Sequence, residues 1–151
     1  MRDQLKQSLK DAMRAKDQRR LSTVRLILAA IKDRDIAARS EDKTDGVDEA
    51  EILQILQKMV KQRREAADTY ESAGRVELAE QEREEMTIIE EFMPRQMSDA
   101  EIDEAVATVI ADIDAASLKD MGKAMAALKD RHAGAMDFKK ASAKVKAALG
   151  G

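Results

Sequence analysis

Residues 48–74 read DEAEILQILQKMVKQRREAADTYESAG, and this stretch decides the fold class. Asp48, followed three residues later by Glu51, has the pattern of a helix N-cap with its capping-box partner. Apolar residues then recur at helical spacing, at positions 52, 55, 56, 59 and 60. Gly74 is the residue type on which helices commonly end in the left-handed conformation. The sequence therefore predicts one long helix between these two signals.

The segments on either side of this helix show the same periodicity and few residues that interrupt helices. Pro94 is the only proline, and the chain has six glycines. Two earlier helices that meet near Lys16 and Asp17, or one helix bent there, are expected, and residues 40–46 form the clearest internal loop. Four later helices are expected, over about 75–91, from Ser98 to about 113, over 119–129 and over 137–149. This pattern predicts an all-α protein.

A break in the helical pattern at residues 92–97 predicts the domain organisation. Proline disfavours helix in the residue before it, so Pro94 ends the preceding helix. Ser98 and Glu101 then form a second capping-box pattern. We therefore expect an N-terminal domain of about four helices over 1–93 and a small three-helix bundle over 94–151.

Composition narrows the class of protein and its compartment. Hydrophobic residues make up 44% of the chain, aromatic residues only 2%, and charged residues of both signs 38%. A core of aliphatic residues favours helices, and this mixture is not typical of disordered chains. The chain has no cysteine, its first residues lack the apolar core of a signal peptide, and no apolar run is long enough to span a bilayer. The prediction is a cytoplasmic protein.

Charge is distributed unevenly along the chain. Residues 1–39 carry eleven Lys and Arg against five Asp, whereas residues 65–93 carry two Arg against ten Asp and Glu. Residues 119–151 carry eight Lys and Arg against three Asp. The basic segments either pair with the acidic helices or present a ligand-binding face, and the sequence leaves both interpretations open.

No motif for catalysis, cofactor binding or metal binding is visible. His132 is the only histidine, and the chain has neither a nucleophile elbow nor a glycine-rich phosphate loop. Residues 42–46 fail as a calcium loop, because Lys43 and Ile52 fall where oxygen ligands are required. The glutamate run over residues 80–91 is interpreted as a solvated helix face. We therefore predict no catalytic residue, no cofactor and no metal, and a protein that acts by contact.

Two sets of cationic residues are candidates for that contact. The first is a patch for phosphate or a protein partner: Arg25, Lys58, Lys61, Gln62 and Arg63. Within it, Arg25 lies beside an apolar stripe, and a carboxylate partner is the favoured role. The second is a patch on the last two helices, where the lysines are expected to point outward: Lys123, Lys129, Arg131, Lys139, Lys140, Lys144 and Lys146.

Several motifs, in this order and spacing, resemble the YqeY family. They are RLSTVR at 20–25, KQR at 61–63, YESAGR at 70–75, FMP at 92–94 and DMGKAM at 120–125. That family consists of free-standing relatives of the tail domain of GatB, a component of the aspartyl/glutamyl-tRNA amidotransferase. The resemblance implies an all-helical protein in two parts, with a C-terminal bundle similar to a module that contacts tRNA. It does not imply amidotransferase chemistry.

Three functions follow from these observations. The first is a non-catalytic accessory protein that binds tRNA, or a tRNA-dependent amidotransferase or synthetase, through its basic helices. The second is a carbon–nitrogen ligase with glutamine as amide donor, which the residues disfavour because no nucleophile is visible. The third is a protein–protein adaptor without RNA contact.

Overall fold

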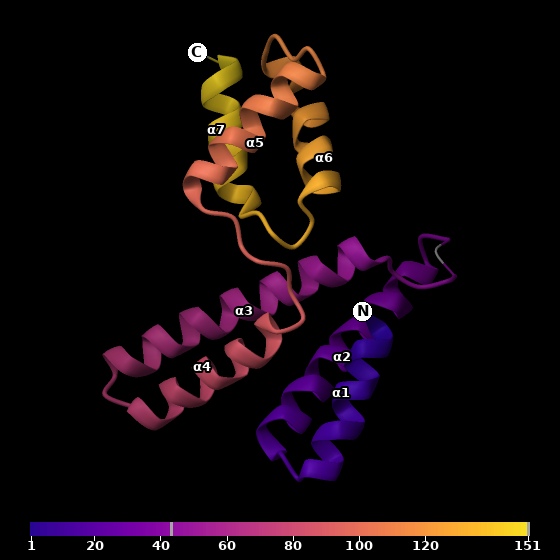
Figure 1. The fold of residues 1–151 in the computed structure, drawn as a ribbon, viewed down its shortest axis with the longest axis vertical. Helices are drawn as coiled ribbons and strands as arrows, with labels where there is room; N and C mark the ends of the chain where they lie inside the picture. Colours follow the sequence, from indigo (N-terminus) through magenta and orange to yellow (C-terminus); the bar gives the residue numbers. More distant parts are fainter. Residues whose placement is uncertain (43, 151) are drawn as a thin grey trace. The chain divides into compact units, whose positions relative to one another are not determined.

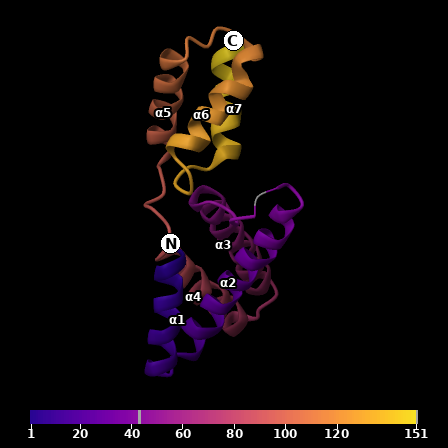
Figure 2. The same cartoon turned by 90° about the vertical axis from the view of Figure 1, so that its right-hand side faces the viewer.

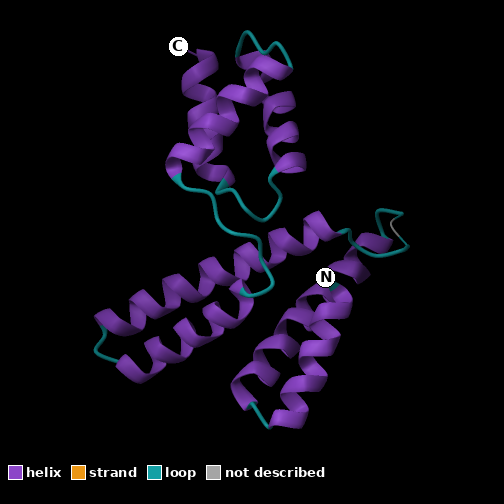
Figure 3. Cartoon of the chain, viewed as in Figure 1, coloured by secondary structure: helices purple, strands orange, loops and turns teal. Residues whose placement is uncertain are grey.

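The structure is a computed structural model that describes residues 1–42 and 44–150. Its described residues form helices, turns and loops without a β-strand (Figure 3), which confirms the predicted all-α class. The chain divides into two compact units, Met1–Pro94 and Arg95–Gly151. That these units are two domains, with the predicted bounds 1–93 and 94–151, stays a prediction.

The first unit consists of two antiparallel helical hairpins (Figure 1). One pairs α1 (Arg2–Ala15) with α2 (Gln18–Arg39), and the other pairs α3 (Glu49–Ser72) with α4 (Val76–Glu90). Between α1 and α2, Lys16 adopts a left-handed conformation with φ 57°, and the Asp17 carboxylate accepts a hydrogen bond from the Arg20 amide. The chain therefore reverses at Lys16 and Asp17, where the sequence placed the junction.

Local signals set both ends of α3. The Asp48 side chain accepts a hydrogen bond of 2.9 Å from the Glu51 amide. At the other end, Gly74 has φ +75°, its amide donates to the Glu71 carbonyl, and the Arg75 amide donates to the Tyr70 carbonyl at 2.8 Å. These two bonds make a Schellman motif, which satisfies carbonyls that would otherwise lack partners at the helix end.

An aliphatic core joins the two hairpins of the first unit. Since the core has almost no aromatic residue, it is filled by interlocking branched side chains from all four helices and from Val47 in the loop before α3. Its buried members are Leu5, Val24, Ile27, Ile31, Ala38, Val47, Ile52, Leu56, Met59, Val60, Ile88 and Ile89.

A polar clamp fixes the loop between α2 and α3. Arg2 donates two hydrogen bonds of 2.9 Å to the carboxylate of Asp35, and a third to the carbonyl of Val47. The Val47 amide in turn donates to Asp35 at 2.8 Å. The hydrogen bonds from Arg2, and then that from Val47, lower the pKa of Asp35 to about 2. Three segments of the chain therefore meet at one carboxylate.

The second unit contains α5 (Asp99–Asp112), the short 3-10 helix η1 (Leu118–Asp120), α6 (Met121–Arg131) and α7 (Phe138–Gly150) (Figure 2). The capping box predicted at Ser98 and Glu101 is present in both directions. A second capping box, between Ser117 and Asp120, starts the 3-10 turn. The sequence suggested that helix α6 begins at Lys119. Because the 3-10 turn precedes α6, the helix begins at Met121 instead.

Apolar residues from α5, α6 and α7 form the core of the second unit. Its buried members are Ile102, Val106, Val109, Ala124, Leu128, Met136, Ala141 and Val145. The segment before α5 is tied to the loop between α6 and α7, because the Gln96 side chain donates to the Gly134 carbonyl and the Met97 amide donates to the Ala135 carbonyl. The unit is thus a three-helix bundle whose N-terminal segment is held by two hydrogen bonds to the loop between α6 and α7.

Candidate anion-binding surfaces

The α3 residues of the first predicted patch, Lys58, Lys61, Gln62 and Arg63, divide into exposed and internal members. Lys58, Lys61 and Gln62 are exposed on α3. Arg63 faces α4, where its Nε donates to Glu85 at 3.0 Å, and both side chains are only 13% exposed. The guanidinium also donates to the Met59 carbonyl. Arg63 is therefore a structural link between α3 and α4 and is not available to a ligand.

A second guanidinium brings α2 into the same charged cluster. Arg19 lies 3.3 Å from Glu84 and 3.8 Å from Glu85, and the buried hydroxyl of Thr23 donates to the Arg19 carbonyl one turn away. Burial, followed by the charge of Glu85, raises the pKa of Glu82. The interpretation of the α4 glutamates as a wholly solvated face is thus wrong for Glu85, because folding places it between two guanidinium groups.

The environment of Arg25 differs from the one that the sequence predicted. The sequence favoured a carboxylate partner for it, but Arg25 is exposed on α2 and makes no ion pair within residues 1–42 and 44–150. The helix turns this side chain away from the apolar stripe formed by Val24 and Ile27, so no buried charge requires compensation. Arg25 is left as an accessible cation.

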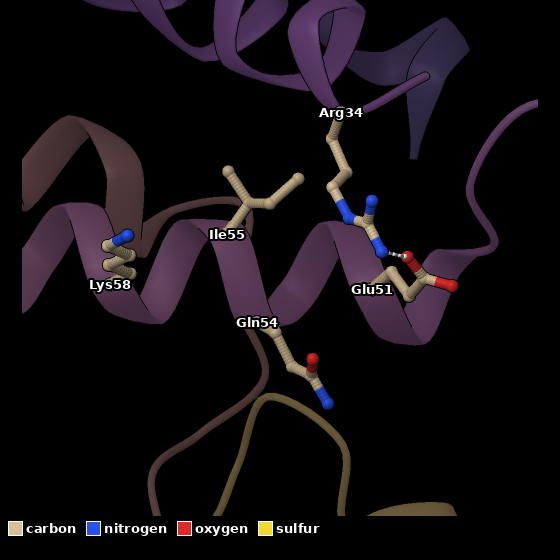
Figure 4. A pocket seen from close by; sticks show the side chains of 5 residues that line it. All are labelled: Arg34, Glu51, Gln54, Ile55 and Lys58. Carbon is tan, nitrogen blue, oxygen red and sulfur yellow. Dashed lines mark ion pairs between the residues drawn. The ribbon is translucent and has the colours of Figure 1, made fainter. Parts of the chain in front are cut away.

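A shallow pocket of about 410 Å³ lies where α2 meets α3 (Figure 4). It is lined by Arg34, Glu51, Gln54, Ile55 and Lys58. Arg34 is 3.5 Å from Glu51 and 3.5 Å from Glu41, so its guanidinium is already engaged by two carboxylates. Across the described part of the chain, no group of three or more His, Cys, Asp or Glu residues could hold a metal ion. Within the described residues, the pocket therefore has no cluster of metal ligands.

Three of the seven cations predicted for the second unit are ion-paired within it. Lys140 lies 3.2 Å from Asp99, Lys144 pairs with Asp103, and Arg131 lies 2.7 Å from Asp112. Because both lysines and both of their partners are four residues apart, the two pairs connect α7 to α5 one helical turn apart. These cations are the partners of an acidic helix.

The other four cations have a different environment. Lys123, Lys129, Lys139 and Lys146 are exposed, and none makes an ion pair with a described residue. Lys139 and Lys146 are seven residues apart, so they share one side of α7, separate from the side that carries Lys140 and Lys144. We call these four residues the unpaired lysine set. The sequence could not separate them from the paired residues, because the pairing depends on how α5 packs.

The fold and the distribution of ion pairs define an all-α protein of two helical units with exposed cations on both units. The chain belongs to the family described as Yqey-like protein, which matches residues 2–149. This confirms the resemblance carried by the sequence motifs.

Curated relatives agree with this assignment. A protein of Lachancea thermotolerans named "Altered inheritance of mitochondria protein 41, mitochondrial" is 30% identical over 151 residues, which cover 96% of this chain and 76% of the relative. Proteins with the same name from Eremothecium gossypii and Kluyveromyces lactis are 39% and 32% identical, over 59% and 72% of this chain. The chain spans only 46% and 58% of their respective lengths.

The names of these relatives bear on localisation. They place the relatives in mitochondria, and the cytoplasmic location expected from the sequence stays a prediction for this chain. None of the described helices is long and apolar enough to cross a bilayer.

Proposed function

We propose that this protein is a non-catalytic accessory factor that binds tRNA through the unpaired lysine set of its second unit. One observation carries the proposal: Lys123, Lys129, Lys139 and Lys146 are exposed and lack ion-pair partners among the described residues, whereas Arg131, Lys140 and Lys144 are paired. When lysines that form no ion pair neutralise phosphates, the counterions condensed on the nucleic acid are released, and this favours binding.

The chemistry of the surface favours a structured RNA over a single strand. The chain has one tyrosine, two phenylalanines and no tryptophan, so it offers few rings on which unpaired bases could stack. Folded RNA is recognised largely by shape and backbone, which lysines on helices can contact. The resemblance of this unit to the tail of the tRNA-dependent amidotransferase makes tRNA, bound alone or on such an enzyme, the proposed ligand.

Two double variants on the same helix test the proposal. Replacing Lys139 and Lys146 by Ala removes two unpaired cations, and replacing Lys140 and Lys144 by Ala removes two paired ones. Both variants change the net charge equally. We expect the first to weaken binding to total tRNA and to flatten the dependence of log affinity on log salt by roughly 0.7–0.9 per lost phosphate contact.

The second variant is the matched control. It should bind tRNA nearly as well as the parent protein, with a slightly lower melting temperature because its helix–helix pairs are lost. Equal losses of affinity in the two variants would mean that net charge alone governs binding. If the parent protein does not bind tRNA at low salt, the adaptor interpretation takes precedence.

A further inference from the structure

A larger set of unpaired cations lies on the α1–α2 hairpin. Four of its arginines, Arg2, Arg19, Arg20 and Arg34, are held in ion pairs with carboxylates. The other cations of the hairpin are exposed, and none makes an ion pair with any residue that the structure describes: Lys6, Lys10, Arg14, Lys16, Arg25, Lys32 and Arg39. The positive charge of residues 1–39 is thus only partly neutralised by folding.

The cations of α1 form a row. Lys6, Lys10 and Arg14 follow one another at intervals of four residues, so they occupy one flank of the helix about 6 Å apart along its axis. The core-facing side of α1 is defined by Leu5 and Ala12, which are buried. The row therefore lies on the outward flank.

Three cations of α2 form a second row. Arg25, Lys32 and Arg39 recur every seven residues, which places them on one side of the helix over about 21 Å. All three are exposed, whereas Val24, Ile27 and Ile31 point into the core.

The Arg2–Asp35 clamp shows that the two rows border the same seam. Its two hydrogen bonds of 2.9 Å cross from α1 to α2. Lys6 follows Arg2 by one turn on α1, and Lys32 and Arg39 lie one turn before and after Asp35 on α2. The two rows therefore flank the line along which the helices meet.

Acidic residues on the hairpin do not balance these rows. Asp35 is occupied by Arg2, Asp17 by Arg20, and Asp11 accepts a hydrogen bond from Gln7. Asp3 and Asp33 are the remaining acidic residues of the hairpin, and both are exposed. We call Lys6, Lys10, Arg14, Arg25, Lys32 and Arg39 the α1–α2 basic face.

We propose that the α1–α2 basic face is a second RNA-binding surface, which contacts the phosphate backbone of a double-helical RNA segment. This inference rests on the proposed function and extends it to the first unit. The two rows of cations can each contact a line of phosphates, and residues 1–39 contain no aromatic side chain on which unpaired bases could stack, which favours contacts with the backbone of a helix. Met13 on α1 and Leu26 and Ile36 on α2 are exposed, but the two α2 residues are ten positions apart, so the three do not make the continuous apolar surface that insertion into a bilayer requires.

The test compares two triple variants of the full chain. In the first, Lys6, Lys10 and Arg25 of the α1–α2 basic face are changed to Gln. In the control, Arg64, Arg75 and Arg83 are changed to Gln; these cations are also exposed in the same unit, and they lie outside the α1–α2 basic face and the patch of Lys58, Lys61 and Gln62. Glutamine preserves helix propensity, and both variants lose three positive charges.

The probes are total tRNA, an RNA hairpin, a single-stranded RNA of equal length and vesicles containing an anionic phospholipid. We expect the parent protein to prefer the hairpin over the single strand. The first variant should weaken hairpin binding at least tenfold at low salt and lower the magnitude of the log–log salt slope by about 2, whereas the control should lower it by less than 1.

The outcomes separate this inference from the proposed function. If the parent protein binds neither tRNA nor the hairpin, both are overturned. If it binds, but the first variant loses no more affinity than the control, only the second surface is overturned. Vesicle binding that exceeds hairpin binding and is lost in the first variant would assign the α1–α2 basic face to lipid and overturn the RNA assignment. A last outcome is that the first variant loses binding while replacing Lys139 and Lys146 has no effect. This result would support the α1–α2 basic face and overturn the proposed contact through the lysines of α7.

Discussion

At the scale of single residues, Asp35 is the side chain on which several segments of the first unit converge. It holds Arg2 from α1 and the Val47 amide from the loop before α3, and its own position is on α2. The adjoining glycine is part of the same arrangement, since a Cβ at Gly46 would lie 2.8 Å from an Asp35 carboxylate oxygen. The loop therefore leaves no room for a side chain at position 46 beside the Asp35 carboxylate.

We expect Asp35→Asn to lower the free energy of unfolding by on the order of 1 kcal/mol at pH 7, because the pair is partly solvated. The pKa of Asp35 is lowered to about 2 in the folded protein, from an ordinary value of 3.8. Its contribution is thus complete above about pH 4 and is lost as the pH falls toward 2. Urea denaturation at pH 7 and pH 2.5 measures this. A stability difference between the two proteins that stays constant over this range would contradict the assignment.

Gly74 provides a second test at this scale. Its φ of +75° favours glycine, and a Cβ added there would meet no described atom within 4 Å. The cost of Gly74→Val is therefore confined to the backbone, and we expect the free energy of unfolding to fall by about 1–2 kcal/mol. Gly74→Asn should cost less, because asparagine tolerates this conformation. Equal melting temperatures for the glycine and valine proteins would show that the Schellman motif does not stabilise the unit.

At the scale of helices, the cluster around Arg63 shows why ion pairs decide which cations are accessible. Glu85 lies between Arg63 of α3 and Arg19 of α2, while the neighbouring Glu84 is 63% exposed and meets Arg19 alone. We expect Glu85→Gln to reduce the free energy of unfolding by about 2 kcal/mol, because Arg63 is left partly buried without its charge partner. Glu84→Gln should change it by less than about 0.5 kcal/mol. Chemical denaturation of the two variants measures both effects, and equal effects would contradict the structural role of Glu85.

The helices themselves were predictable because their signals are local. The caps at Asp48, Ser98 and Gly74 each depend on residues within a few positions, and apolar periodicity identifies the helix faces without knowledge of the fold. The ion pairs that engage Arg63 and Lys140 are not local. Arg63 and Glu85 are separated by 22 positions, and Lys140 and Asp99 by 41. The sequence therefore identified basic segments correctly but could not tell paired cations from unpaired ones.

At the scale of the whole molecule, the change from one unit to the next falls at Pro94 and Arg95. The backbone between α4 and α5 is outside any helix, and Pro94, Arg95 and Gln96 are exposed. We expect limited proteolysis to cleave within residues 93–98 before it cleaves inside α3 or α5, since helices protect their backbone from proteases. Mass spectrometry of the first fragments identifies the site. First cleavage within 52–72 or 102–113 would contradict this boundary.

The central claim for the whole molecule is that cations left unpaired by folding bind the phosphate backbone of tRNA. The most direct test is the affinity of the unaltered protein for total tRNA, measured by titration at several salt concentrations. Our account predicts binding at low ionic strength and a linear fall of log affinity with log salt, with a slope of about −0.7 to −0.9 for each phosphate contacted. Absence of binding at low salt, or an affinity independent of salt, would contradict it.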